Sequence, residues 1–157
     1  MATKTELYKD LNDQLRALLS DEHDLIANAA NLASLLYHGL PDLNWAGFYF
    51  LKNGGLVLGP FQGKIACTRI AMGNGVCGAA AETRQTVLVM NVHEFPGHIA
   101  CDGASNSEIV VPILKDSQII GVLDLDSPQF GRFDDDDRAG LELLVRSFIE
   151  LTDIVVP

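Results

Sequence analysis

The chain has 157 residues, a length that predicts one domain. Its 21 acidic and 11 basic side chains give a net charge of −10, and this field argues against nucleic acid and anionic membrane surfaces as partners. With 48% hydrophobic and 20% charged residues the chain is too apolar to be disordered, and no apolar run is long enough to span a membrane.

The N-terminus and the cysteine content point to a reducing compartment. No apolar stretch follows Lys4, so we expect no secretory signal and a cytoplasmic protein. Thiols stay reduced there. The three cysteines are an odd number and a poor disulfide framework, so we expect them to be reactive, metal-binding or simply buried.

Residues 1–40 are expected to form two helices, because their leucines and alanines recur at helical spacing. Thr3 with Glu6 predicts a capping box for the first helix. Ser20, followed by two acids, is expected to cap the second helix. Gly39 is expected to end the second helix in a left-handed turn.

Residues 43–127 change to short aromatic and β-branched runs broken by Gly and Asn, which predicts a sheet. One hairpin is expected over 45–58 and another over 109–126. The stretch between them has little periodicity, with a short strand at 86–90 and a small helix at 76–83. All the cysteines lie in this stretch, and loops carried on a rigid sheet commonly hold functional sites.

A last amphipathic helix is predicted over 134–155. The four acids that open it are interpreted as a helix cap, because acids in the first turn match the helix dipole and a calcium loop needs spaced ligands and a central glycine. Helices, two antiparallel hairpins and a final helix predict an α+β fold with helices grouped about an antiparallel sheet.

The end of the second hairpin offers a pair of acids. Side chains two apart on a strand share a face, so Asp124 and Asp126 are expected to point the same way, together with Ile120 and Val122. Two buried carboxyl groups so close together favour holding a proton, which makes a candidate acid. The alternative is that the strand ends at Asp124 and that both acids are solvated in the following turn.

Neighbouring strands add an acid and two aromatic residues. Glu108 lies on the partner strand of the same hairpin, and Trp45 and Tyr49 share one face of the first hairpin. If these strands present the same side of the sheet, they form an aromatic wall beside three acids, which suits a small cation with an apolar tail. The alternative for the two aromatic residues is ordinary core packing.

Cys67, Cys77 and Cys101 have three interpretations. With His93 and His98 nearby a zinc site is conceivable, but the spacing lacks any C-x-x-C or paired histidines. A redox role fits better, because a thiol oxidised to sulfenic acid can be resolved by a second thiol in a nearby loop. The third interpretation is that all three are buried and inert.

Six stretches of the chain resemble one family, the free methionine-(R)-sulfoxide reductases, which are GAF domains. They are Leu43–Tyr49, Leu58–Cys67, Gly73–Gly78, His98–Asp102, Ser107–Pro112 and Gly121–Ser127. The resemblance implies a single GAF domain over 1–157. In that fold an antiparallel sheet of about six strands has the N-terminal and C-terminal helices on one side and the pocket-forming loops and short helix on the other.

The resemblance also implies roles for the cysteines and the pocket residues. Cys101 resembles the attacking cysteine and Cys67 its resolving partner, while the role of Cys77 is open. Two aromatic residues match those that enclose the methyl and sulfoxide end of the substrate, and three acids match those that hold its ammonium group and engage the sulfoxide oxygen. These five residues are Trp45, Tyr49, Glu108, Asp124 and Asp126.

The expected function is therefore reduction of free methionine sulfoxide through a sulfenic acid and an intramolecular disulfide. The resemblance implies thioredoxin as the reductant, a homodimer, and neither cofactor nor metal. The rival from another class is a non-catalytic GAF sensor that binds a small ligand, and the three cysteines argue against it because such a sensor does not need them.

Overall fold

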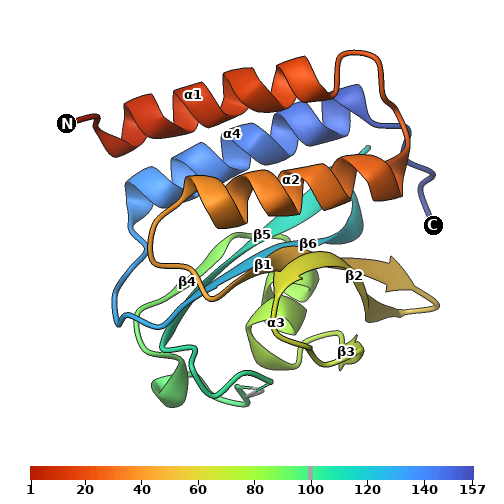
Figure 1. The fold of residues 1–157 in the computed structure, drawn as a ribbon. Coiled ribbons are helices and arrows are strands. Elements are labelled where there is room, and N and C mark those ends of the chain that lie inside the picture. Colours follow the sequence, from red (N-terminus) through yellow and green to blue (C-terminus); the bar gives the residue numbers. More distant parts are fainter. Residues whose placement is uncertain (99–100) are drawn as a thin grey trace.

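The structure of the protein is a computed structural model that describes residues 1–98 and 101–157. Ile99 and Ala100, within the His98–Asp102 stretch singled out above, lie outside the described residues. The fold has an antiparallel sheet with a layer of helices on one face and a helix with irregular segments on the other (Figure 1).

The described residues form a six-stranded antiparallel sheet in the order β3-β2-β1-β6-β5-β4. The strands are β1 (Trp45–Lys52), β2 (Gly55–Gly63), β3 (Arg69–Ala71), β4 (Val87–Val89), β5 (Ser107–Lys115) and β6 (Gln118–Ser127). Both predicted hairpins are present, and β2 runs further than the expected end at residue 58. The predicted α+β fold with about six antiparallel strands is confirmed.

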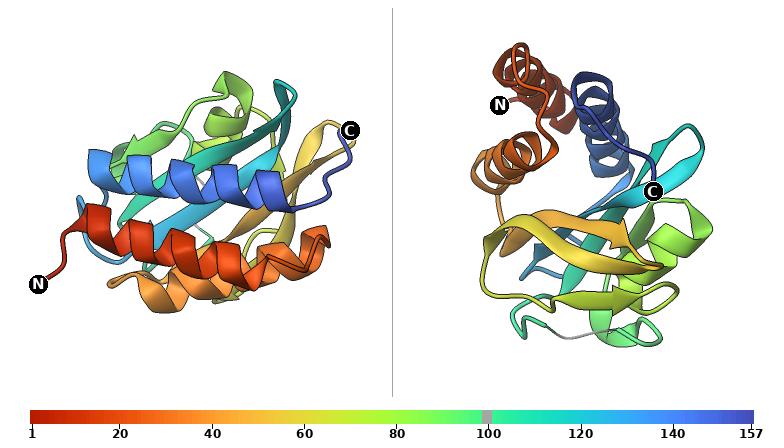
Figure 2. Two further views of the ribbon diagram at one scale, coloured as in Figure 1. Left: turned by 90° about the horizontal axis from the view of Figure 1, so that it is seen from above. Right: turned by 90° about the vertical axis from the view of Figure 1, so that its right-hand side faces the viewer.

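Three helices cover one face of the sheet: α1 (Lys4–Leu18), α2 (Leu25–Gly39) and α4 (Asp135–Leu151) (Figures 1 and 2). The short helices α3 (Gly75–Thr83) and η1 (Val92–Glu94) belong to the other side. The sheet therefore separates two apolar clusters, one beneath the three long helices and one against α3. None of the helices among the described residues is both long and apolar enough to cross a membrane.

The start of α1 is as predicted, and the start of α2 is not. Thr3 and Glu6 form the expected capping box, with Thr3 Oγ1 accepting a hydrogen bond from the Glu6 N–H at 3.1 Å. The prediction that Ser20 caps the second helix is wrong, because its hydroxyl donates to a carbonyl at the end of α1. Asp24 is the N-cap of α2 and accepts from the third N–H of the helix at 2.8 Å.

Gly39 ends α2 for a different reason from the one predicted. It is the last helical residue, and the chain leaves through Leu40 at φ −105°, so the predicted left-handed turn at this glycine is wrong. A Cβ at Gly39 would lie 2.7 Å from Leu11 Cδ2, so glycine here permits close packing of α2 against α1. The left-handed conformation falls instead on Asp42, at φ 60°.

The acids that open α4 form the predicted cap. The Asp134 carboxylate accepts from two N–H groups of the first turn. Asp137 is 1% exposed and accepts from the Tyr8 hydroxyl at 2.7 Å, the Lys4 ammonium at 2.7 Å and the Arg132 guanidinium at 3.3 Å. The charge of Asp137 is thus paired, and it binds α1 to α4.

The strand β6 keeps its two acids on one face, but not every neighbour predicted for them. Val122 lies in the cluster against α3, on the side of Asp124 and Asp126, as expected. Ile120 was expected on that face and lies in the opposite cluster, so this prediction is wrong. The pairing of β5 with β6 shifts after Ile113, and the unpaired residue reverses the alternation.

Candidate active site

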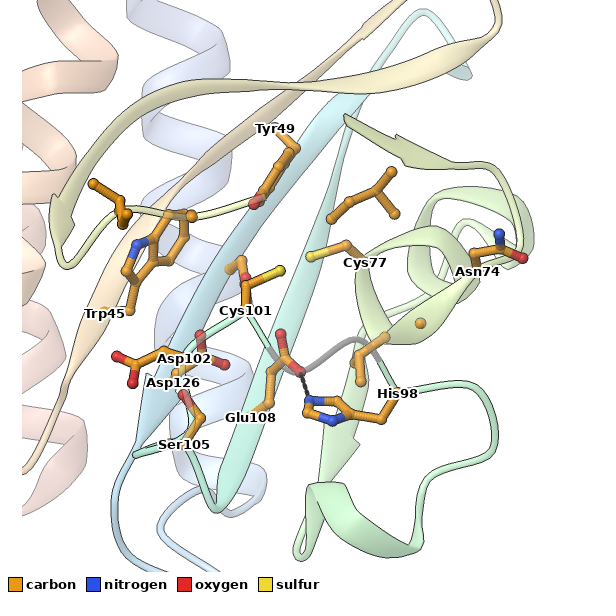
Figure 3. A pocket seen from close by; sticks show the side chains of 16 residues that line it. Trp45, Tyr49, Asn74, Cys77, His98, Cys101, Asp102, Ser105, Glu108 and Asp126 are labelled. Atoms are coloured by element: carbon orange, nitrogen blue, oxygen red, sulfur yellow. Dashed lines mark ion pairs between the residues drawn. The ribbon is translucent and has the colours of Figure 1, made fainter. Parts of the chain in front are cut away.

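A cavity of about 50 Å³ lies on the face of the sheet opposite the three long helices, on the side of the apolar cluster against α3. It brings together residues from β1, β5, β6, α3 and the loops that precede β3 and β5 (Figure 3). All eight residues predicted for the site contribute to it or to the disulfide beside it. They are Trp45, Tyr49, Cys67, Cys77, Cys101, Glu108, Asp124 and Asp126.

The three acids come together through strand register. Asp126 lies opposite Glu108 on β5 and opposite Trp45 on β1, and Asp124 pairs with Val110 and Gly47. Both acids of β6 lie inside the strand, which continues to residue 127, so the alternative that the strand ends at Asp124 is wrong. Glu108 is 6% exposed and Asp124 is 5% exposed.

Burial decides the protonation of this acid cluster. Removal from water raises the pKa of Glu108, Asp124 and Asp126, and the neighbouring carboxyl groups raise the pKa of Glu108 and Asp126 further. Hydrogen bonds with Glu108 and Cys77 offset part of the rise in the Asp124 pKa. The cluster therefore retains protons that exposed carboxyl groups have lost. Among the described residues Asp124 Oδ1 has no hydrogen-bond partner, which leaves it available to a ligand.

The aromatic residues belong both to the core and to the cavity wall, so the two interpretations of them combine. Trp45 stacks between Tyr49, at 6.0 Å between ring centroids, and Phe61, at 5.3 Å. The polar ends of the two wall residues are held: Trp45 Nε1 donates to the carbonyl of Lys64 at 3.1 Å, and the Tyr49 hydroxyl donates to the carbonyl of Cys67 at 2.8 Å. Rigid rings thus line the cavity.

Two of the cysteines are joined and the third is free. Cys67 and Cys101 form a disulfide with their Cα atoms 5.7 Å apart, so in this structure their sulfur atoms are not free to bind zinc together with His93 and His98. Cys77 is buried, and burial followed by the acidic neighbours raises its thiol pKa. The Cys77 sulfur and one oxygen each of Glu108 and Asp124 lie within 4.8 Å of one another. Among the described residues, these three side chains are the one group close enough together to bind a metal ion, and two of them belong to the acid cluster.

Sequence reasoning considered His98 of the cavity wall only as a zinc ligand. It gave no site role to Asp102 and Ser105, which also line the cavity, or to Asn44, which holds both of them. His98 Nε2 lies 3.9 Å from Glu108 Oε1, and burial lowers the pKa of the imidazole (Figure 3). A hydrogen bond from the Ala104 N–H lowers the pKa of Asp102. Proximity of His98 and Asp102 to Cys101 along the chain was the available signal.

The comparisons with known proteins agree with this geometry. A family model of the GAF domain matches residues 20–148. Free methionine-R-sulfoxide reductase of Escherichia coli is 58% identical over 142 residues, covering 90% of this chain and 86% of that protein. The chain belongs to the free methionine-R-sulfoxide reductase family of GAF domains.

Solved structures of this reductase family superpose closely on the chain. The fRMsr of Staphylococcus aureus in complex with its substrate has a TM-score of 0.88 at 50% identity, covering 92% of this chain and 94% of that one. The free methionine-R-sulfoxide reductase of Neisseria meningitidis, also with its substrate, has a TM-score of 0.92 at 42% identity, covering 96% and 91%. The fold described above is therefore that of the reductase family.

Proposed function

We propose that the chain reduces free L-methionine-(R)-sulfoxide to methionine with electrons from its own thiols. The observation that carries the proposal is the disulfide between Cys67 and Cys101, with Cys101 on the wall of a cavity that also holds three acids and two aromatic rings. A ligand-binding sensor needs the cavity but not a cysteine pair beside it. The named relatives, which are methionine sulfoxide reductases, support the same reaction.

Two features of the cavity match the two ends of the substrate. The acid cluster of Glu108, Asp124 and Asp126 would hold the α-ammonium group and hydrogen-bond the sulfoxide oxygen. Trp45 and Tyr49 would enclose the methyl and sulfoxide end, where apolar contact is available. Because a methionine within a polypeptide has no α-ammonium group, the acid cluster favours the free amino acid.

The chemistry takes two steps at Cys101. In the first, the Cys101 thiolate attacks the sulfoxide sulfur while a neutral carboxylic acid of the acid cluster protonates the sulfoxide oxygen. The oxygen then passes to the Cys101 sulfur as the S–O and S–S bonds to the substrate sulfur break. Methionine leaves with the electron pair on its sulfur, and Cys101 is left as sulfenic acid. In the second, Cys67 attacks the Cys101 sulfur, the oxygen departs as water and the disulfide forms. The two thiols supply both electrons, and the raised pKa values of the acid cluster keep a proton available for the first step.

The disulfide must then be reopened by an external dithiol, and we propose thioredoxin for this task in a cytoplasmic setting. We also propose that the chain acts as a homodimer. Turnover that depends on thioredoxin, thioredoxin reductase and NADPH tests the first proposal. Light scattering of the purified protein at micromolar concentration tests the second, with a mass of one chain as the contrary result.

The decisive experiment incubates the protein with a racemic mixture of free methionine sulfoxide and dithiothreitol, followed by chiral analysis. Loss of the R epimer alone is expected. Cys101→Ser should abolish turnover while calorimetry still detects substrate binding, because the acid cluster and the aromatic residues are intact. The pre-reduced Cys67→Ser variant should release one methionine per chain. Further turnover should then stop when thioredoxin is the reductant, because the variant cannot form the disulfide that thioredoxin reduces. Binding of the sulfoxide without any consumption by the wild type would instead identify a sensor.

A further inference from the structure

The strand β1 and the residue before it donate hydrogen bonds to both loops that carry the redox cysteines. On one side the Trp45 indole N–H and the Tyr49 hydroxyl bond the carbonyls of Lys64 and Cys67, at 3.1 and 2.8 Å. These two carbonyls lie in the loop between β2 and β3. The bond from Tyr49 ends on the backbone of the cysteine itself.

On the other side Asn44 holds the loop of Cys101. Its side-chain amide donates to Asp102 Oδ2 at 3.0 Å and to Ser105 Oγ at 2.9 Å, and its backbone N–H donates to the Asp126 carbonyl at 3.0 Å. Asp102 directly follows Cys101, and the Asp102 carboxylate also accepts from a backbone N–H of its own loop at 2.9 Å. Asn44 therefore ties the loop of Cys101 to the same strand that ties the loop of Cys67.

These bonds bear on the second chemical step. A disulfide forms only when the two sulfur atoms come into contact, and these cysteines are 34 residues apart in sequence, so their approach depends on how the two loops are held. Among the described residues the segment between β2 and β3 has one other backbone tie to the sheet, from Leu58 N–H to the Thr68 carbonyl at 3.0 Å. The side chains of β1 therefore supply two of these three hydrogen bonds, and the one from Tyr49 is the bond to Cys67 itself.

We propose that Tyr49 is a positioning residue for disulfide formation: its hydroxyl holds the loop of Cys67, while its ring forms part of the cavity wall. Asn44 is a second positioning residue, which holds the loop of Cys101. The inference rests on the proposed function. In the step concerned the Cys67 thiol attacks the Cys101 sulfenic acid, the S–S bond forms, the S–O bond breaks, and the oxygen leaves as water with the thiol proton. No other oxidant or reductant takes part.

Tyr49→Phe separates the hydroxyl from the ring. The variant keeps the stack with Trp45, but Tyr49 also lines the cavity, so its rate of methionine release is measured first and its rate of disulfide formation is compared with that rate. Loss of one hydrogen bond on the loop of Cys67 should slow disulfide formation roughly three- to tenfold. Asn44→Ala should slow methionine release as well, because the loop that it frees carries the attacking cysteine.

The experiment follows a single turnover of pre-reduced protein. Methionine release reports the first step, and the disappearance of free thiols reports the second. Dimedone, which reacts with sulfenic acid, is added at intervals, and labelled Cys101 is measured by mass spectrometry. In Tyr49→Phe we expect thiol loss to slow more than methionine release does, and we expect more dimedone label than in the wild type. Tyr37→Phe, which removes the hydroxyl of a tyrosine on α2 outside the cavity, is the matched control and should behave as the wild type.

The choice of reductant gives an independent measurement. Dithiothreitol can attack the sulfenic acid directly, whereas thioredoxin acts on the disulfide. Tyr49→Phe should therefore lose more activity with thioredoxin than with dithiothreitol. Wild-type rates of disulfide formation in both Tyr49→Phe and Asn44→Ala would overturn the inference. Failure of the proposed function has another signature, because then the wild type itself would release no methionine. If Tyr49→Phe does not fold, Asn44→Ala still tests the same anchoring without altering the aromatic wall.

Discussion

Glu108→Gln should abolish efficient reduction of the sulfoxide and at the same time stabilise the fold. The Glu108 side chain is buried beside Asp124 and Asp126, and burial followed by these neighbours raises its pKa well above the ordinary value for glutamate. The amide has nearly the same shape and can still donate a hydrogen bond to either neighbour, but it carries no charge and transfers no proton.

The sign of the effect depends on pH. Below about pH 4 the Glu108 carboxyl is protonated in the folded and the unfolded chain alike, so the substitution should change stability little. Above that pH the unfolded chain releases the proton while the folded chain retains it, so the wild type loses stability as pH rises toward the folded pKa. The amide has no such loss, and the gain of Glu108→Gln should therefore grow between pH 4 and pH 8.

The magnitude follows from burial. A carboxyl group that is 6% exposed and has like-charged neighbours is typical of sites where an uncharged isostere gains about 1–3 kcal/mol. A domain of this size shifts its midpoint by roughly 3 °C for each kcal/mol, so we expect a rise of about 3–9 °C at pH 8. The kcat/KM for free methionine-(R)-sulfoxide should fall by roughly 10²–10⁴, the usual contribution of a general acid.

Calorimetric melting at pH 4 and pH 8 measures the stability, and methionine release measures the activity. Glu94→Gln is the matched control, because this glutamate is exposed on η1 and its loss should change neither quantity. A lower melting temperature for Glu108→Gln at pH 8, or an equal gain at both pH values, would refute the argument that burial of this carboxyl is unfavourable.

Three further predictions concern the substrate, the cavity wall and the helical layer. A sulfoxide with its amine acetylated and its carboxyl amidated should lose at least 100-fold in kcat/KM, because the acid cluster meets no cation; comparable turnover would contradict the assignment. Gly47→Ala should raise KM and destabilise the fold by about 1–3 kcal/mol in urea unfolding, because its Cβ would lie 2.8 Å from Trp45 Cη2. Tyr8→Phe should cost about 1–3 kcal/mol in urea unfolding with kcat unchanged, because buried Asp137 loses a donor far from the cavity.

Local patterns in the sequence predicted most of the fold. The capping box of Thr3 and the acids before α4 were readable because each involves residues a few positions apart. The error at Ser20 was local, because its hydroxyl bonds the carbonyl of Ala17 in α1. The other errors came where contacts from elsewhere decide the local structure. Gly39 is required by the approach of Leu11 from another helix. A bulge at Ile120 likewise depends on the partner strand.

The site divides in the same way. The acids and aromatic residues lie on strands, where alternation predicts which side chains share a face, and Asp124 and Asp126 follow that rule. The joining of Cys67 to Cys101 was implied by family resemblance and by no spacing rule, because loops without periodicity bring these residues together. Asn44 and Ser105 escaped notice for the same reason, since their importance lies in contacts between segments distant in the chain.

The disulfide joins two cysteines that are 34 residues apart in sequence, and the chain between them includes α3 and β4. Such a covalent tie limits the freedom of the unfolded chain and is worth about 2–4 kcal/mol. In each catalytic cycle the protein would thus alternate between an oxidised, inactive form of higher stability and a reduced, active form of lower stability. In a cell short of reducing equivalents, the protein would accumulate in the oxidised form, which resists heat and proteolysis until a reductant becomes available again.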